Sequence, residues 1–456
     1  MTKPTSWNGD NQAMDNYNRS WPHSRSLLTT YGHTRTCQPL DNPEHLQTAP
    51  GTQVGNVNML TRALYASIPP SVDATQAMRK EHFEQIVHEH CLNRASYWLT
   101  SPPPLVSGAL LAASKSTIWA LYLSAWLFQA TDGSMHSTII SRCIDGLDKL
   151  GQEPGYEYHS NSSLNSTGGW LNTQVTVIFI KFTTIGCSSG YLALQKALPW
   201  IFRLVAIDPD LHIEHPAGDL VTSFSRILCA PRYEFQWFVM YDTIASLLLA
   251  VPPLMEYGYA GECDPTSHSL EWAHGIPFAL FGVISQINSW RAGSRVASLN
   301  DWRTLERRVL GWQSQPDATE GKACVDDAVR LAIQEGWRHV TLIYMYMGIC
   351  GVSSHDTRVQ ESIREIIRLG EAMDDLPIGV HILPHCVIVG LAAKYEKHRA
   401  IIHKKLLSFK GSRVWLFHGL EFARVLEHLW YGVGAGGAPV TWDDYVQSRR
   451  AVVPTI

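Results

Sequence analysis

From Asn58 onward, apolar residues recur at the spacing of amphipathic α-helices, and proline or glycine repeatedly ends one such stretch before the next begins. Residues 357–373 are the clearest case, because one face carries an aliphatic stripe while arginines and glutamates fill the other. The stripe consists of Val359, Ile363, Ile366 and Ile367. Asp356 or Thr357 is expected to cap the start of this helix. The pattern predicts an all-α fold of many packed helices.

The same periodicity divides the chain into a tail and one large helical domain. Residues 1–56 are rich in Asn, Thr, Ser, Gln, Pro and Gly, and such a segment cannot bury enough apolar surface to offset the entropy of ordering it. We therefore expect a disordered tail over 1–56 and a multi-helix domain over 57–450, with polar loops at 151–169 and 260–268. Its further helices are expected near 76–98, 107–130, 136–150, 232–251, 276–291, 301–312, 322–349, 380–393, 395–409 and 414–431.

Composition argues against several classes of protein. With 456 residues and a net charge of −4, the chain lacks the basic character of most DNA-binding domains. Its nine cysteines are widely separated, so they predict neither a disulfide framework nor a local zinc site, and they favour a reducing compartment. The longest apolar stretches, 117–130 and 243–255, are shorter than the roughly 20 residues of a membrane-spanning helix. No signal-peptide pattern opens the sequence, so we expect an intracellular protein without a membrane segment.

The stretch EGWRHVTLIYMYMGICG at 335–351 places tryptophan, arginine and histidine together before an apolar run. Its apolar side chains surround nearly the whole circumference of a helix, and a helix that is apolar on every side is buried among others. They are Trp337, Val340, Ile343, Tyr344, Met347 and Ile349. We therefore interpret Arg338 and His339 as hydrogen-bonded anchors at the start of a buried helix, with a functional pocket as the alternative.

Residues 186–190 match G-x-S-x-G, the nucleophile elbow of α/β-hydrolases, in which a tight turn exposes Ser188 at the top of a sheet. The preceding run, 175–182, is β-branched and aromatic and is typical of a strand. However, no HGGG-like segment lies upstream, and almost no other run is strand-like, so the parallel sheet that this fold requires is not predicted. A serine hydrolase using Ser188 is therefore the alternative. In a helical protein the segment 173–190 has no evident role.

Two further patterns imitate binding sites. Residues 432–437 match G-x-G-x-x-G, but they follow a helical segment and not a strand, so we expect a turn and not a dinucleotide site. The basic run 393–413 predicts an amphipathic helix with a positive solvent face, which is able to contact an acidic partner.

Histidine spacing also suggests metal sites. His381 and His385 are separated by one helical turn, and His82 precedes the closely spaced His88 and His90. No HExxH pattern or third ligand accompanies either group, so we expect surface or capped histidines and no metal.

Four segments together resemble, in order and spacing, the fungal-specific transcription factor domain, the regulatory region that follows the binuclear zinc cluster in fungal regulators. The segments are RYEFQWFVMYDTIASLLLAVPPLMEYGY (232–259), LEWAHGIPFALFGVISQINSWRA (270–292), GWRHVTLIYMYMGICGVSSHDTRVQESI (336–363) and LPIGVHILPHCVIVGLAAKYEKHRAII (376–402). The positions that match the family's structural motifs are Arg232, Tyr233, Glu271, Trp272, Gly275, Pro277, Trp337, Arg338 and Tyr344. Gly336 departs from the family pattern, which usually has a good helix former there.

The resemblance implies a nuclear, non-enzymatic transcription regulator with a large helical regulatory domain. Its partners would be other regulatory proteins, a second copy of itself in a homodimer, or a small-molecule effector. The paired CxxC motifs of the zinc cluster do not occur in this sequence, so we expect this chain neither to bind DNA directly nor to hold a cofactor. Zinc would belong only to an N-terminal cluster outside it. A helical scaffold for protein partners, without a regulatory role, is a further alternative.

Overall fold

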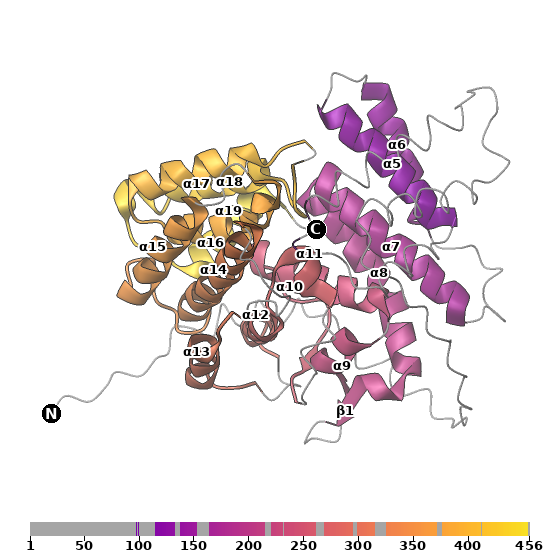
Figure 1. Cartoon of the computed structure of the whole chain (residues 1–456), viewed down its shortest axis with the longest axis horizontal. Coiled ribbons are helices and arrows are strands. Elements are labelled where there is room, and N and C mark those ends of the chain that lie inside the picture. The colour runs from indigo at the N-terminus through magenta and orange to yellow at the C-terminus, as the bar shows by residue number, and fades with distance from the viewer. Residues whose placement is uncertain are drawn as a thin grey trace.

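The computed structural model describes most of the chain from residue 97 onward. The described residues are 97, 99, 115–132, 137–152, 164–214, 220–230, 232–260, 269–294, 299–314, 325–371, 376–411 and 413–454. The tail predicted over 1–56 lies outside them, as do the histidines at 82, 88 and 90 and the loop expected over 261–268. The described chain consists of helices and one small three-stranded sheet, which confirms the all-α prediction (Figure 1).

Four helices form the N-terminal part of the described chain. α5 and α6 lie against α7, and α7 pairs along its length with α8 (Figure 1). The helices are α5 (Lys115–Asp132), α6 (Ser137–Leu150), α7 (Leu164–Thr184) and α8 (Cys187–Ile207). α5 and α6 share a small core with one face of α7, formed by Ala120, Leu127, Cys143, Leu147, Val177 and Ile180.

α7 shows that two expectations from the sequence are wrong. The strand predicted over 175–182 is helical, and residues 164–169 of the loop predicted over 151–169 belong to α7, which begins at Leu164. The run is apolar and β-branched because it is buried on two sides, and a buried helix and a buried strand look alike in such a run. Val175, Ile178 and Phe182 join the main core, whereas Val177 and Ile180 join the small core. The hydroxyls of Thr176 and Thr184 donate to carbonyls four residues earlier, at 2.9 and 2.7 Å, and so stay satisfied within the helix.

A small sheet and four helices form the centre of the molecule. β1 pairs antiparallel with β2, and β2 pairs parallel with β3, with Ser223 opposite Gly258. The elements are β1 (His212–Glu214), β2 (Leu220–Ser223), α9 (Phe224–Cys229), α10 (Tyr233–Leu248), β3 (Tyr257–Gly258), α11 (Ser269–His274) and α12 (Phe278–Arg291). Every residue of α10 from Phe235 to Leu248 is buried except Trp237, because α7, α8, α11, α12 and α16 all pack around it.

The C-terminal helices lie on the opposite side of α10 and α12 from α5 and α6 (Figure 1). They are α13 (Trp302–Gly311), α14 (Val325–Gly348), α15 (Thr357–Glu371), η6 (Pro377–Ile382), α16 (Leu383–Ala392), α17 (Glu396–Ser408), α18 (Gly419–Tyr431), η7 (Ala435–Gly437) and α19 (Trp442–Val452). α14 is the central helix of this part, since α12, α13, α15 and α16 pack against it.

Most of the two predicted buried faces is confirmed here. Trp337, Val340, Ile343, Tyr344 and Met347 of α14 are all buried, as are Val359, Ile363 and Ile366 of α15. Ile349, which follows the end of α14, and Ile367 are only partly buried. Asp356 caps α15, because its carboxylate accepts the backbone N–H of Arg358 at 2.9 Å. α19 was not predicted, although the sequence signals its start: Thr441 and Asp444 form a capping box.

Most of the described cysteines are not disulfide-bonded. Cys143, Cys187, Cys350 and Cys386 form no disulfide, whereas Cys229 is disulfide-bonded. The wide cysteine spacing, which predicts no disulfide framework, therefore misses one bridge. None of the described helices is both long and apolar enough to cross a bilayer.

Candidate functional site: the motif core and the adjoining cavity

The segment around Gly275 joins α11 to α12. Glu271, in α11, accepts the backbone N–H of Phe278 at 2.6 Å and so caps α12, directly after Pro277. Gly275 has a φ of +65°, and a Cβ there would come within 3.0 Å of Leu99 and Ile333. Only glycine adopts this backbone and leaves this space at low cost. Trp272 lies in the same short helix, α11.

The motif segments meet in a buried cluster of histidines and tryptophans. Trp415 donates its indole N–H to Nδ1 of His274 at 2.5 Å, and their rings lie 5.2 Å apart. The ring of Trp337 lies 6.5 Å from that of Trp415 and 4.9 Å from that of His385. His381 also lies within this cluster, 5.9 Å from His274. The EWAHG segment and the Trp-Arg helix, which are 62 residues apart at His274 and Gly336, therefore build one core.

The histidine pair of η6 and α16 has a structural role in this cluster. Nε2 of His385 lies 3.1 Å from the carbonyl oxygen of Ile333, and His381 contacts the carbonyl of Tyr97. Burial lowers the pKa of His385 to about 4. Hydrogen bonds to the carbonyls of Ile333 and His381 favour the charged form, but their effect is smaller than that of burial. The ring is therefore neutral near pH 7. Surface or capped histidines were predicted; both side chains are buried, so the surface alternative is wrong, and each ring lies against a backbone carbonyl. No group of three or more metal-binding side chains occurs in the described part of the chain.

Gly336, the position that departs from the family pattern, faces the ring of His385. A Cβ at Gly336 would lie 2.6 Å from Cδ2 and 2.7 Å from Nε2 of that ring. The ring of His385 therefore occupies, between α14 and α16, the space that a side chain at position 336 would need. This packing gives a reason for glycine at this position.

Arg338 and His339 are hydrogen-bonded, as predicted, although they lie in the middle of α14 and not at its start. Arg338 donates from Nε to Glu335 at 2.8 Å, and Nε2 of His339 lies 3.4 Å from the same carboxylate. The hydrogen bond from His339 and the contacts from Arg338 lower the pKa of Glu335 to about 2.

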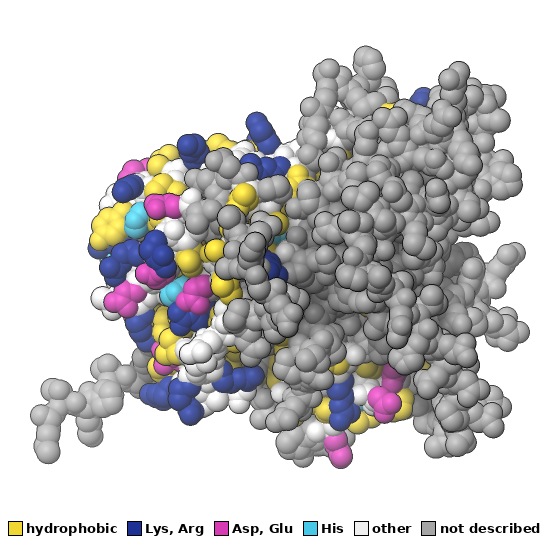
Figure 2. All heavy atoms as spheres, viewed as in Figure 1, with side chains coloured by type: hydrophobic (Ala, Val, Ile, Leu, Met, Phe, Trp, Pro, Cys, Tyr) yellow, Lys and Arg dark blue, Asp and Glu magenta, His cyan; other side chains and the backbone are white. Residues whose placement is uncertain are grey.

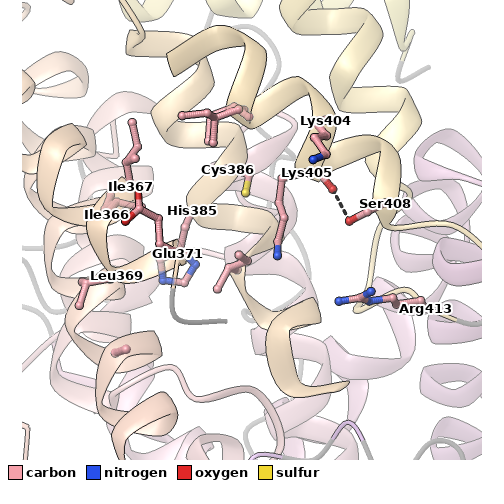
Figure 3. A pocket seen from close by; sticks show the side chains of 16 residues that line it. Ile366, Ile367, Leu369, Glu371, His385, Cys386, Lys404, Lys405, Ser408 and Arg413 are labelled. Atoms are coloured by element: carbon pink, nitrogen blue, oxygen red, sulfur yellow. Dashed lines mark hydrogen bonds between the residues drawn. The ribbon is translucent and has the colours of Figure 1, made fainter. Parts of the chain in front are cut away.

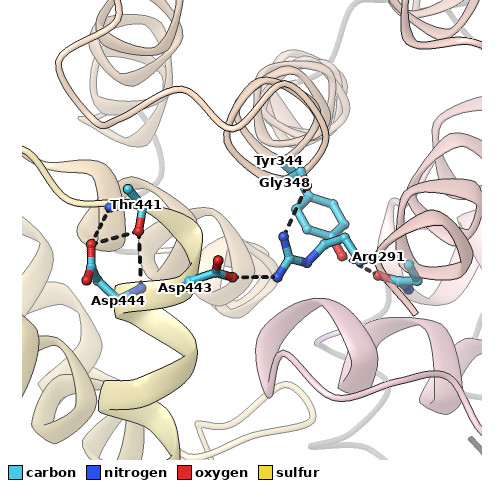
Figure 4. Close-up of polar contacts among 7 residues, drawn as sticks. Arg291, Tyr344, Gly348, Thr441, Asp443 and Asp444 are labelled. Carbon is cyan, nitrogen blue, oxygen red and sulfur yellow. Dashed lines mark hydrogen bonds and ion pairs between the residues drawn. The ribbon is translucent and has the colours of Figure 1, made fainter. Parts of the chain in front are cut away.

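Tyr344 connects three helices through Asn288. Its hydroxyl donates to Oδ1 of Asn288 at 2.7 Å, and Nδ2 of Asn288 donates to the carbonyl of Thr243 at 2.9 Å. The ring of Tyr344 also stacks on Trp442 of α19, with centroids 4.4 Å apart. Figure 4 shows Arg291 beside Tyr344, donating to the carbonyl of Gly348 and to Asp443.

The first two motif positions lie apart from this core, at the start of α10. Arg232 donates to Glu234 at 2.8 Å and lies over the ring of Phe235, 4.7 Å from its centroid. Partial burial raises the pKa of the neighbouring Tyr233. These contacts hold the chain at the point where α10 begins.

A cavity of about 450 Å³ opens between α14, α15, α16 and α17 (Figure 3). Its aliphatic lining includes Ala332, Ile366, Ile367, Leu369, Ile382 and Ile402. Its described polar lining carries more positive than negative charge, since Lys404, Lys405 and Arg413 accompany one acid, Glu371. His385 lines the cavity and also contacts Trp337, so its ring connects the cavity with the buried cluster of histidines and tryptophans, called the motif core below.

The G-x-S-x-G segment is the start of a helix and not a nucleophile elbow. α8 begins at Cys187, whose backbone N–H is accepted by both carboxylate oxygens of Glu421 at 3.1 Å. Gly186 has a φ of +136°, and a Cβ there would lie 2.8 Å from Glu421. The hydroxyl of Ser188 donates to the carbonyl of Pro454 at 2.8 Å. The preceding segment is α7, so the strand that an elbow requires is missing.

The glycine-rich segment 432–437 is a turn after α18, as predicted. Gly436 and Gly437 have φ values of +65° and +79°. Arg399 of α17 donates to the carbonyl of Gly434 at 2.9 Å, and to that of Ala393 at 3.0 Å.

α17 differs from the predicted amphipathic helix in two ways. Arg399, expected on its positive solvent face, is only 5% exposed, whereas Ile401 and Leu407 are 38% and 39% exposed. The helix turns these two aliphatic residues outward because Ile402 and Leu406 supply its buried side.

These contacts place His274, Gly275 and Trp337 in one buried core of a helical domain. The sequence profile of the fungal-specific transcription factor domain matches residues 218–453, more than half of the 456-residue chain. The chain belongs to this family of transcription regulators. No curated protein and no solved structure matches it.

Several residues of the core were not singled out from the sequence. Asn288 and Trp415 are the main ones, because their partners Tyr344 and His274 lie 56 and 141 residues away. The sequence marks them only as a polar residue and a tryptophan within apolar segments. Their roles follow from helix packing, which periodicity does not determine.

Proposed function

We propose that this chain is the regulatory domain of a nuclear transcription regulator, acting through contacts with other regulatory proteins and without catalysis. The observation that carries the proposal is the family match over 218–453. The convergence of Glu271, Gly275 and Trp337 around one buried core supports it, because those residues serve packing and capping.

Direct DNA contact is not part of the proposal. The sequence has a net charge of −4 and no paired CxxC motif. On the face in Figure 2, Lys and Arg side chains of the described C-terminal helices are interspersed with acidic and hydrophobic ones. Among the coloured residues of that face, which are the described ones, Lys and Arg do not form a stripe of the kind that follows a phosphate backbone. We expect no sequence-specific gel shift with the chain alone.

A tethering experiment tests the regulatory role. The full chain is fused to an unrelated DNA-binding domain, and transcription of a reporter with the matching sites is compared with that of the DNA-binding domain alone. We expect reporter output to change and a fluorescent fusion of the chain to accumulate in the nucleus. Reporter output equal to that of the DNA-binding domain alone, with the fusion expressed at the same level, contradicts the proposal.

Matched glycine variants show whether the effect needs the folded core. Gly275→Val forces a β-branched residue into a left-handed backbone against Leu99 and Ile333, so it should remove the reporter effect. Gly311→Ala at the end of α13 meets no atom within 4 Å and should keep it.

A further inference from the structure

We propose that the cavity between α14, α15, α16 and α17 binds an amphipathic ligand with an aliphatic body and one carboxylate head group. Its regulatory meaning rests on the proposed function, but the binding itself is a property of the purified chain. The volume of about 450 Å³ lies within the range of small-molecule sites, which is roughly 300–1,000 Å³.

The lining determines the body of the ligand. Aliphatic side chains from four helical elements surround the space, and the described lining residues include no Phe, Tyr or Trp, so the imidazole of His385 is the one ring among them. A flat aromatic ligand would therefore find only this ring to stack on, whereas a hydrocarbon chain or an alicyclic body gains contacts on several sides. Gly370 also lines the cavity, and a Cβ there would meet no atom within 4 Å.

The charges determine the head group. Figure 3 shows Ile366, Ile367 and His385 on one side of the space and Lys405 and Arg413 on the other, with the ends of both cationic side chains turned toward it. Both cations make other contacts as well, so the head group would share them. Lys404 adds a third positive charge, and a carboxylate suits this set because Arg and Lys form charge-assisted hydrogen bonds with it. A cationic ligand would be repelled by these three positive charges, and among the described lining residues Glu371 is the one acid that could offset them.

The cavity is also placed to influence the motif core. The ring of His385 lies between the cavity and Trp337, and Gly336 of α14 lines the same wall. A ligand that presses on His385 therefore acts directly on the contact between α14 and α16. The site thus offers a route from a bound effector to the segments that define the family.

Calorimetric titration of the purified full chain tests the binding. The probes are dodecanoate below its micelle concentration, dodecan-1-ol and acetate. We expect dodecanoate to bind, dodecan-1-ol to bind about 10-fold more weakly for lack of the charged head group, and acetate to give no measurable heat. Absence of dodecanoate binding overturns the proposal. Equal affinity for dodecanoate and dodecan-1-ol overturns the assignment of the head group.

Charge variants locate the head group. Lys405→Gln and Arg413→Gln should each weaken dodecanoate binding about 10-fold and leave dodecan-1-ol unchanged. Lys404→Gln removes an exposed cavity residue and provides a variant whose folding is not in question. Lys410→Gln is the matched control, because this exposed lysine of the same segment does not line the cavity. Affinity that all three cavity variants leave unchanged overturns the head-group assignment.

Filling variants locate the body of the ligand. Gly370→Ile adds a side chain at a lining position where a Cβ would meet no atom within 4 Å, and it should weaken both long-chain ligands at least about 10-fold. Gly311→Ile, also without contacts but outside the cavity, should bind like the wild type. Undiminished binding by Gly370→Ile places the ligand elsewhere and contradicts the proposal. The tethered reporter is independent of these titrations, so each proposal can fail without the other.

Discussion

Asp242 is a carboxylic acid in the centre of the molecule, and we predict that it makes the stability of the fold depend on pH. It is fully buried in α10. Its Oδ1 accepts the backbone N–H of Leu254 at 2.7 Å, and its Oδ2 accepts the hydroxyl of Tyr257 at 3.1 Å. Burial raises its pKa from 3.8 to about 7, although these bonds and one from the backbone of Met255 favour the charged form.

The sign follows from the direction of this change. The folded state binds the proton more tightly than the unfolded state, so the contribution of Asp242 to stability is fully present below pH 3.8 and is lost as the pH rises through about 7. Each pH unit in this window is worth about 1.4 kcal/mol. Between pH 5 and pH 8 the contribution should therefore fall by about 3 kcal/mol.

The measurement is urea unfolding of the wild type and of Asp242→Asn at pH 5, 6, 7 and 8. The amide has the shape of the protonated acid and does not titrate, so the free energy of unfolding of the wild type, minus that of the variant, should fall by about 3 kcal/mol across the series. Asp145→Asn, at an exposed aspartate of α6, is the control and should change nothing. A wild-type and Asp242→Asn pair whose difference stays constant with pH would refute the reasoning.

Three other outcomes are expected. Gly336→Ala should lower the free energy of unfolding by about 1–3 kcal/mol through overlap with His385, and in the background of His385→Ala the same change should be neutral or stabilising by up to about 1 kcal/mol. Tyr344→Phe leaves the buried Asn288 without its donor and should cost about 1–3 kcal/mol in urea unfolding, whereas Tyr431→Phe at an 80% exposed tyrosine should cost nothing. A serine-reactive phosphonate should not label the protein at Ser188, and labelling that disappears in Ser188→Ala would restore the hydrolase alternative.

Periodicity predicted the helices that have a clear pattern. α15 alternates aliphatic and charged faces, and α14 is apolar all round from Trp337, so the arrangement of side chains alone indicates what is buried. The prediction for residues 175–182 is wrong for the opposite reason. There the β-branched residues are buried on two sides, and local propensity is overridden by packing between two cores.

The candidate site was predicted only in part. The family resemblance could pick out Glu271, Gly275 and Trp337, but it could not show that Trp415 donates to His274 across 141 residues. The burial of Arg399 could not be predicted from the sequence either, because its acceptors are backbone carbonyls, which every residue has. The cavity depends on the relative placement of four helical elements, which no single segment encodes.

α7 belongs to two cores at once, and this has a consequence for how the protein opens. The main hydrophobic cluster takes none of its described members from α5 or α6, which rest on Val177 and Ile180 of α7. The small helical pair can therefore detach while the remaining helices stay assembled, whereas loss of the main core removes the surface on which the pair rests. The pair α5 and α6 depends on the main core, but the main core does not depend on the pair. Amide hydrogens of α5 and α6 should therefore exchange through a lower-energy opening than those of α10.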